Sequence, residues 1–418
     1  MRLLELSFFE NKKIVAFATI PLLIASLFIS YTIGKEVNII SDFNVFWQAG
    51  TNFMNHLPLY SRIGGAERYI YPPFAAMCFQ LFALLSIHKA AAIFCFCNCL
   101  IWVGVIYYTK IILLLTSASI KQINYSLIIA FILSFRYLWY HLSFIQMNEL
   151  VLLLTLAGVY YFLKKRNSIA IPLLVIAVFI KIIPILILAW VLSKSNYKAY
   201  IQTGIYFMLC LLTPFLFRGI HQGINDMQDY YVTFLQPFQE GRVEAKIQNY
   251  GLAAALFKIF SYTEDGNKYH YIITILNPET VTLIYKSILL FSFVGFIVLL
   301  VYSRFVAKTI SLVELGFILM FTHLLSGITW EYYLITLFFI IPMLVLNYMR
   351  AKPTHKWFYY VLGLILVFNA VIGGDTVGND IYYKSCGYSL LTWMLLFLEL
   401  YFLIIYLVSK SNRLELKH

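Results

Sequence analysis

The sequence predicts an all-α polytopic membrane protein with about 12 transmembrane helices and with interfacial helices in its external loops. Hydrophobic residues make up 61% of the 418 residues and charged residues only 12%, whereas a soluble domain carries about a quarter charged residues. A soluble fold is therefore excluded. The formal net charge of +12 would suggest a nucleic-acid-binding protein only in a soluble chain, so it is tested first against membrane topology.

Apolar runs that approach the roughly 20 residues needed to cross a bilayer recur along the chain. The expected spans are residues 14–33, 90–109, 125–140, 148–163, 169–180, 182–193, 199–217, 281–303, 311–328, 333–349, 357–373 and 388–408. The first run lacks a cleavage site and is expected to remain as a span. The short pair 169–180 and 182–193 is expected to form short helices in a shielded region or a re-entrant hairpin.

The distribution of Lys and Arg predicts that both termini are cytoplasmic. With that orientation, basic residues are about fourfold denser in the cytoplasmic segments than in the external ones, which include large loops at 34–89 and 218–280. The apolar stretch Phe74–Leu85 is kept outside as an interfacial helix, because counting it as a span would place Lys164, Lys165 and Arg166 outside. Membrane insertion thus explains the net charge, and no nucleic-acid partner is expected.

Polar groups in or beside the apolar runs predict a cavity that opens to the external side, because ionisable residues at membrane depth are costly and usually mark a site. No matching set is expected on the cytoplasmic face, which argues against a transporter. The groups are Asp42, Arg136, His141, Gln146, Asn148, Glu149, Lys181, Arg218, Gln248, Asn249 and Glu331.

Asp42 is the candidate catalytic residue. It lies in the expected first turn of an amphipathic helix that follows Ser41, where the helix dipole stabilises a carboxylate. An ionised carboxylate at the mouth of an apolar cavity can accept a proton from a sugar hydroxyl. The alternative is that Asp42 only caps the helix.

Four cationic side chains are candidates for binding a phosphate: Lys181, Arg62, Arg68 and Arg218. The arginines can clamp a phosphate or contact lipid headgroups. Lys181 lies at the tip of the short pair of apolar arms, where it either meets an anion such as a lipid phosphate or reaches the external interface.

Carboxylate, amide and aromatic groups at the external ends of several spans are candidates for sugar or acceptor binding, because sugars are held by hydrogen bonds and ring stacking. The same residues would also fit an interfacial aromatic belt with polar anchors. They are Tyr60, Tyr71, Gln146, Asn148, Glu149, Gln248, Asn249, Trp330 and Glu331. Asp226 and Asp229 are expected to be solvated, and neither a metal site nor a cofactor is expected because no nucleotide-binding motif is present.

An ordered series of motifs resembles glycosyltransferase family 87 over about residues 36–350. The series comprises Ser41-Asp42-Phe43, Pro58-Leu59-Tyr60, Tyr71-Pro72-Pro73, Gln146-Met147-Asn148, Ile180-Lys181-Ile182-Ile183-Pro184, Gln248-Asn249 and Ser326-Gly327-Ile328-Thr329-Trp330-Glu331. The family pattern usually has Ser-Pro before the tryptophan and a His shortly after it, where this chain has Ser326-Gly327 and Tyr332. That departure bears on acceptor binding or proton shuttling.

The resemblance implies a GT-C fold over residues 1–350, with 351–418 as additional C-terminal transmembrane helices. It further implies an inverting hexosyltransferase of the plasma (inner) membrane that moves mannose on the external face. The partners would be a polyprenyl-phosphate sugar donor, a lipid-linked or glycan acceptor and membrane lipids. Asp42 would be the base, and Lys181 with nearby cations would hold the donor phosphate. The alternatives from other classes are a transporter of lipid-linked glycans or small solutes and a non-catalytic scaffold.

Overall fold

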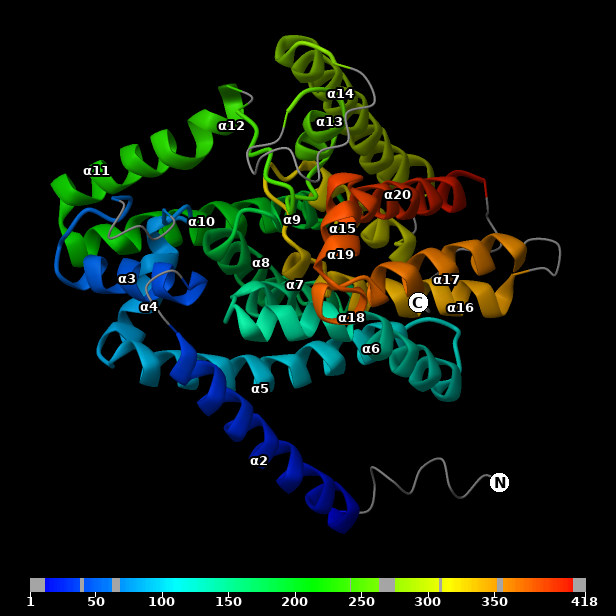
Figure 1. Ribbon diagram of the computed structural model, residues 1–418, viewed down its shortest axis with the longest axis horizontal. Helices are drawn as coiled ribbons and strands as arrows, with labels where there is room; N and C mark the ends of the chain where they lie inside the picture. Colours follow the sequence, from blue (N-terminus) through cyan, green and yellow to red (C-terminus); the bar gives the residue numbers. More distant parts are fainter. Residues whose placement is uncertain are drawn as a thin grey trace.

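The computed structural model describes residues 12–37, 41–61, 68–240, 242–262, 275–307, 310–351 and 356–408. Within these ranges the elements are α-helices joined by turns and loops, with two π-helical segments, one 3-10 segment and no β-strand (Figure 1). The predicted all-α class is confirmed for this part of the chain.

A helix occupies each predicted span. These helices are α2 (Lys12–Glu36), α5 (Ile87–Leu113), α6 (Ile120–Ser143), α7 (Asn148–Leu163), α8 (Asn167–Ile180), α9 (Ile185–Ser193), α10 (Tyr197–Arg218), α14 (Pro278–Tyr302), α15 (Leu312–Leu325), α16 (Leu337–Arg350), α17 (Lys356–Val371) and α20 (Leu390–Val408). Among the described residues, five helices are long and apolar enough to cross a membrane: α5, α6, α10, α14 extended to Phe305, and the continuous stretch Glu331–Arg350. The remaining crossings, and the count of about 12, stay predictions.

Shorter helices lie between the spans. The two helices expected in the loop 34–89 are confirmed as α3 (Asp42–Met54) and α4 (Pro73–Ala83), and α13 (Leu252–Phe260) lies in the loop 218–280. Helices that the sequence did not predict are α11 (Ile220–Tyr230), α12 (Gln236–Glu240), α18 (Gly374–Val377) and α19 (Asn379–Gly387), with the π-helical turn η1 (Tyr231–Leu235), η2 (Ser303–Ala307) and the 3-10 segment η3 (Glu331–Thr336).

Helix α3 packs closely on α4 and α5, and this packing positions Asp42. A side chain at Gly50 would come within 2.5 Å of the Phe79 carbonyl oxygen, so the two backbones approach as only glycine allows. The rings of Phe46 and Phe79 stack at 5.1 Å, and Phe43 lies 5.7 Å from Phe94 on α5. The apolar face of α3 is thereby buried, and its first turn is held at a fixed place.

Figure 1 shows α7 and α8 in the middle of the molecule, with α5 on one side and α15 and α20 on the other. Helix α2 leaves the bundle beside α5 and carries exposed apolar side chains such as Leu22 and Phe28. At opposite edges lie α11 with α12 and α16 with α17. Helices α3 and α4 are grouped near α10, so residues far apart in sequence meet there.

A buried polar cluster lies at span ends that the sequence analysis assigns to the cytoplasmic side, where no matching set of polar groups was expected. Glu314, fully buried, forms an ion pair with Lys194 at 2.9 Å and accepts hydrogen bonds from Trp190 Nε1 at 2.6 Å and Ser303 Oγ at 2.9 Å. The cluster joins α9, the end of α14 and the start of α15. A carboxylate paired with a cation and satisfied by two further donors stabilises this helix junction.

Candidate active site

A cleft of about 540 Å³ opens between the start of α3, the end of α6 and the segment before α13. The segment 328–333 and helix α19 complete its wall. Its lining residues are Asp42, Val45, Phe46, Arg68, Ile70, Tyr71, Tyr140, Phe144, Gln146, Glu244, Lys246, Gln248, Ile328, Trp330, Glu331, Tyr332, Tyr333 and Tyr382. Seven of the residues predicted from the sequence therefore share one cleft: Asp42, Arg68, Tyr71, Gln146, Gln248, Trp330 and Glu331.

Asp42 is the first residue of α3 and is half-buried in the wall of this cleft. Its Oδ2 atom accepts a hydrogen bond from Gln146 Nε2 at 2.6 Å and another from the Tyr332 hydroxyl at 3.1 Å. Tyr332 thus contacts the carboxylate at the position where the family pattern departs. Two donors from different elements fix the orientation of the carboxylate, as a general base requires.

Aromatic rings form the wall beside Asp42. Tyr71 lies before α4, and Tyr333 lies in η3 with its ring 5.2 Å from that of Tyr332. Burial, reinforced by the negative charge of Asp42, raises the pKa of Tyr71 well above its ordinary value. Its hydroxyl therefore stays protonated near neutral pH and can donate a hydrogen bond.

Lys181 lies behind this aromatic wall. It is the extended residue between α8 and α9, and it lines a separate small cavity of about 50 Å³. Its Nζ atom donates to Asn148 Oδ1 at 2.6 Å and lies 3.3 Å from the centre of the Tyr333 ring. Tyr333 lines both spaces, so this ring separates the ammonium from the main cleft. Burial lowers the pKa of Lys181, an effect that the nearby Asp42 carboxylate opposes, and the residue does not line the cleft.

The arginines occupy different surroundings. Arg68 is exposed and lines the cleft. Arg62 lies outside the described residues. Arg218 is buried away from the cleft, with Nε 2.6 Å from Asp226 Oδ2 and Nη atoms donating to the carbonyl oxygens of Asn52, Phe53 and Leu57 at 2.8–3.0 Å.

The prediction that Asp226 is solvated is wrong, because its side chain is only 1% exposed. Gly219 explains the pairing with Arg218: its φ of +76° ends α10 and lets α11 turn back toward it. The clip of Arg218 and Asp226 thus fastens α10 and α11 to the C-terminal end of α3.

Three further predicted residues lie outside the cleft and support its walls. The Tyr60 hydroxyl donates to the Tyr71 carbonyl oxygen at 2.7 Å. Asn249 donates to the Gly327 carbonyl oxygen at 2.9 Å and accepts from the Thr329 amide at 2.9 Å, which fixes the segment that carries Trp330. The fully buried Glu149 lies 3.3 Å from His141 Nδ1, beneath the end of α6.

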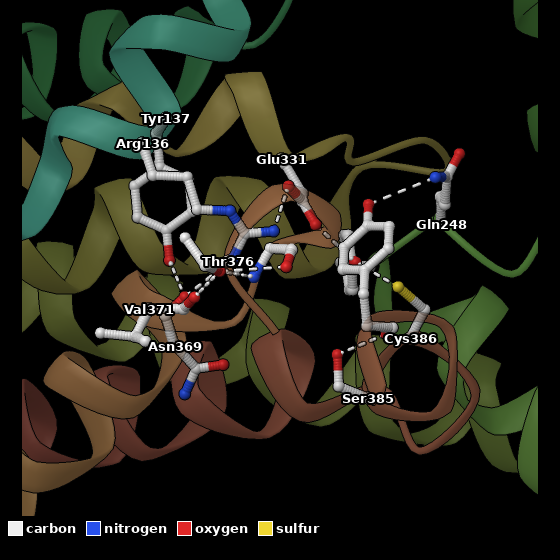
Figure 2. Close-up of polar contacts among 12 residues, drawn as sticks. Arg136, Tyr137, Gln248, Glu331, Asn369, Val371, Thr376, Ser385 and Cys386 are labelled. Carbon is white, nitrogen blue, oxygen red and sulfur yellow. Dashed lines mark hydrogen bonds and ion pairs between the residues drawn. The ribbon is translucent and has the colours of Figure 1, made fainter. Parts of the chain in front are cut away.

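A second hydrogen-bonded group lies around Glu331 (Figure 2). Glu331 Oε2 pairs with Arg136 Nη2 at 2.7 Å, and Oε1 accepts from the Tyr250 hydroxyl at 2.9 Å. Gln248 Nε2 donates to the Tyr382 hydroxyl at 3.2 Å. We name these five residues the glutamate cluster. It places a carboxylate, an amide and phenolic hydroxyls on one side of the same cleft.

Sequence reasoning missed four of the charged or hydroxyl-bearing residues in the cleft: Glu244, Lys246, Tyr140 and Tyr382. Glu244 and Lys246 form an ion pair at 2.7 Å, and Lys246 Nζ lies 5.8 Å from the Trp330 ring centre. The signal available for the first two was their closeness to Gln248 in the sequence. For Tyr382 no local pattern exists. Across the described ranges, no three His, Cys, Asp or Glu side chains converge as metal ligands.

The arrangement suits a reaction in which a hydroxyl group is deprotonated and a polar, ring-shaped substrate is held. The model of glycosyltransferase family 87 matches residues 69–327, which is more than half of the chain. A search of curated proteins gives no match. The match covers the cleft segments from Tyr71 to Gln248 and confirms the resemblance found in the sequence. The chain therefore belongs to glycosyltransferase family 87 and is a membrane glycosyltransferase.

Proposed function

We propose that this transferase moves a hexose, mannose in the first instance, from a polyprenyl-phosphate carrier to a lipid-linked or glycan acceptor on the external face. The observation that carries the proposal is the half-buried carboxylate of Asp42, oriented by Gln146 and Tyr332 in the wall of the cleft. The reaction inverts the anomeric carbon, because one carboxylate that deprotonates the acceptor serves a single displacement.

The chemistry follows from the charges of the cleft. Asp42 takes the proton of the acceptor hydroxyl while that oxygen forms a bond to the anomeric carbon. The bond from this carbon to the phosphate oxygen breaks, and the polyprenyl phosphate leaves as an anion. Arg68, exposed on the cleft, is placed to pair with this phosphate. Lys181 lies behind the Tyr333 ring and adds positive potential in its protonated form, which the Asp42 carboxylate favours and burial opposes. The proton on Asp42 then passes to water.

The rest of the cleft suits a sugar. Trp330 offers an aromatic face, and Gln248 with Glu331 offers an amide and a carboxylate for hydroxyl groups. The proposal assigns no direct phosphate contact to Arg218, whose guanidinium is occupied by Asp226 and three carbonyl groups.

The test is a transfer assay with the purified full chain in lipid nanodiscs. The protein receives radiolabelled polyprenyl-phosphate mannose together with total membrane lipids, and the products are separated by chromatography. We expect a new labelled lipid, and none when GDP-mannose replaces the lipid-linked donor. Labelled product from GDP-mannose alone would contradict the donor assignment. A second preparation in proteoliposomes tests the alternative function. If the labelled donor crosses the membrane unchanged and no new labelled product forms, the result would favour a transporter.

A further inference from the structure

The C-terminal segment 356–408 supplies part of the cleft wall, although it lies beyond the family match at residues 69–327. Tyr382 on α19 lines the cleft together with Trp330 and Glu331. The sequence predicted this segment only as additional transmembrane helices. A residue from the chain's own C-terminal part therefore contacts the space in which substrates would bind.

Buried polar contacts hold this segment against the rest of the molecule. Arg136 donates to Glu331 and, through Nη1, to the Asn369 carbonyl oxygen at 2.9 Å, so one guanidinium joins the cleft to the end of α17 (Figure 2). Lys258 Nζ donates to the Cys386 carbonyl oxygen at 2.9 Å, and the Tyr250 hydroxyl lies 3.0 Å from Cys386 Sγ. Fixed in this way, α19 presents Tyr382 at a defined position.

The groups around Tyr382 match the hydroxyl groups of a sugar. Its hydroxyl oxygen accepts from Gln248 Nε2 at 3.2 Å, and the Glu331 carboxylate lies beside it. A phenolic hydroxyl, an amide and a carboxylate thus lie on this side of the cleft, and the Trp330 ring offers a surface on which the apolar face of a sugar can stack.

The charges of this part of the cleft are paired within the protein. Glu331 is matched by Arg136 at 2.7 Å, and Glu244 by Lys246 at 2.7 Å. A ligand bound beside Tyr382 therefore meets dipoles and ions that are already paired. The pairing favours an uncharged sugar over a phosphorylated one.

We propose that Tyr382, with Gln248 and Glu331, forms the subsite for a neutral sugar of the acceptor and that Tyr382 is a specificity-determining residue. The inference rests on the proposed function. The C-terminal segment then selects the acceptor, while Asp42 deprotonates the acceptor hydroxyl and Arg68 pairs with the donor phosphate.

The first test compares Tyr382→Phe with Tyr383→Phe, a matched loss of one hydroxyl at the next residue of α19, which does not line the cleft. Methyl α-mannoside serves as a soluble acceptor of labelled mannose from polyprenyl-phosphate mannose. A lost neutral hydrogen bond weakens binding by about two- to tenfold. We expect Tyr382→Phe to raise the acceptor KM by this factor, with kcat and donor KM unchanged. An unchanged acceptor KM, or an equal change in Tyr383→Phe, would overturn the proposal.

The second test needs no turnover. Saturation-transfer NMR in nanodiscs measures binding of methyl α-mannoside and, separately, of mannose 6-phosphate. The wild type should bind the neutral sugar more tightly, and Tyr382→Phe should weaken that binding while Tyr383→Phe does not. Sugar binding that depends on Tyr382 without any transfer would support the subsite and contradict the proposed function. If mannose is transferred but Tyr382→Phe leaves sugar binding unchanged, the result would support the proposed function and overturn the subsite. Transfer together with tighter binding of mannose 6-phosphate than of methyl α-mannoside would lead to the same conclusion.

Discussion

The role of Arg218 gives a quantitative prediction, because sequence reasoning assigned it to the donor phosphate and the structure shows it in a buried clip. Its side chain is 0% exposed and that of Asp226 is 1% exposed. Removing one partner of a buried ion pair costs about 3–5 kcal/mol, since the other charge is left uncompensated. Arg218→Met also removes the donors to three carbonyl groups at the end of α3. We therefore expect at least about 4 kcal/mol of lost stability.

The assay is thermal unfolding of the purified protein in nanodiscs, followed by intrinsic fluorescence, with transfer measured on the folded fraction. The expected fall in apparent Tm is roughly 5–10 °C for Arg218→Met. Arg68→Leu serves as the control, because Arg68 is exposed and should leave Tm unchanged. An Arg218→Met protein with wild-type Tm and a strongly raised donor KM would refute the stabilising role of the Arg218–Asp226 ion pair. It would show instead that the guanidinium binds the donor.

Three further substitutions test the cleft. Gln146→Leu removes the 2.6 Å hydrogen bond to Asp42 and should lower kcat about tenfold with donor KM unchanged in steady-state kinetics; an unchanged kcat would show that Gln146 does not orient the base. Glu331→Gln leaves the Arg136 charge uncompensated and should lower stability by about 3 kcal/mol in denaturant unfolding. Restored stability in the double variant with Arg136→Met would confirm the pair, and strictly additive losses would argue against it. Arg68→Leu should raise donor KM about tenfold at low salt and less at high salt, because an exposed charge is screened; a shift independent of salt would contradict a phosphate contact.

The helices were largely predictable from the apolar runs, and their ends were not. The span expected at 90–109 is the helix Ile87–Leu113. Its ends include His88, Lys89 and Lys110, polar residues that form helix as readily as their apolar neighbours. A count of apolar residues detects only the apolar part of a helix and therefore misses polar residues that extend its ends. The same reason explains why α6 extends over Ile120–Ser143 around the expected 125–140.

The convergence of polar groups was also predictable in outline. Asp42, Gln146 and Glu331 come from three separate parts of the sequence and line one cleft. Which groups pair within the protein was not predictable, because pairing depends on tertiary distance. Lys181 follows a recognisable break between two short apolar arms, but no local pattern indicates that the Tyr333 ring lies 3.3 Å from its amino group.

Two contacts show most clearly which interactions cannot be predicted from a single sequence. Asp226 looked like a solvated loop carboxylate, and only the turn at Gly219 brings it back to Arg218. Tyr382 and Gln248 are hydrogen-bonded although they are 134 residues apart in the sequence, so the local sequence around either residue does not indicate the contact. Long-range pairs of this kind are fixed by how helices pack, which a single sequence does not state.

The most direct test of the central claim is the Asp42→Asn variant in single-turnover transfer from polyprenyl-phosphate mannose, with donor affinity measured separately. The amide keeps the size of the side chain and loses the base, so we expect normal insertion, donor binding within about twofold of wild type, and transfer slower by about 10²–10⁴-fold. Transfer at a rate close to that of the wild type would show that another group deprotonates the acceptor.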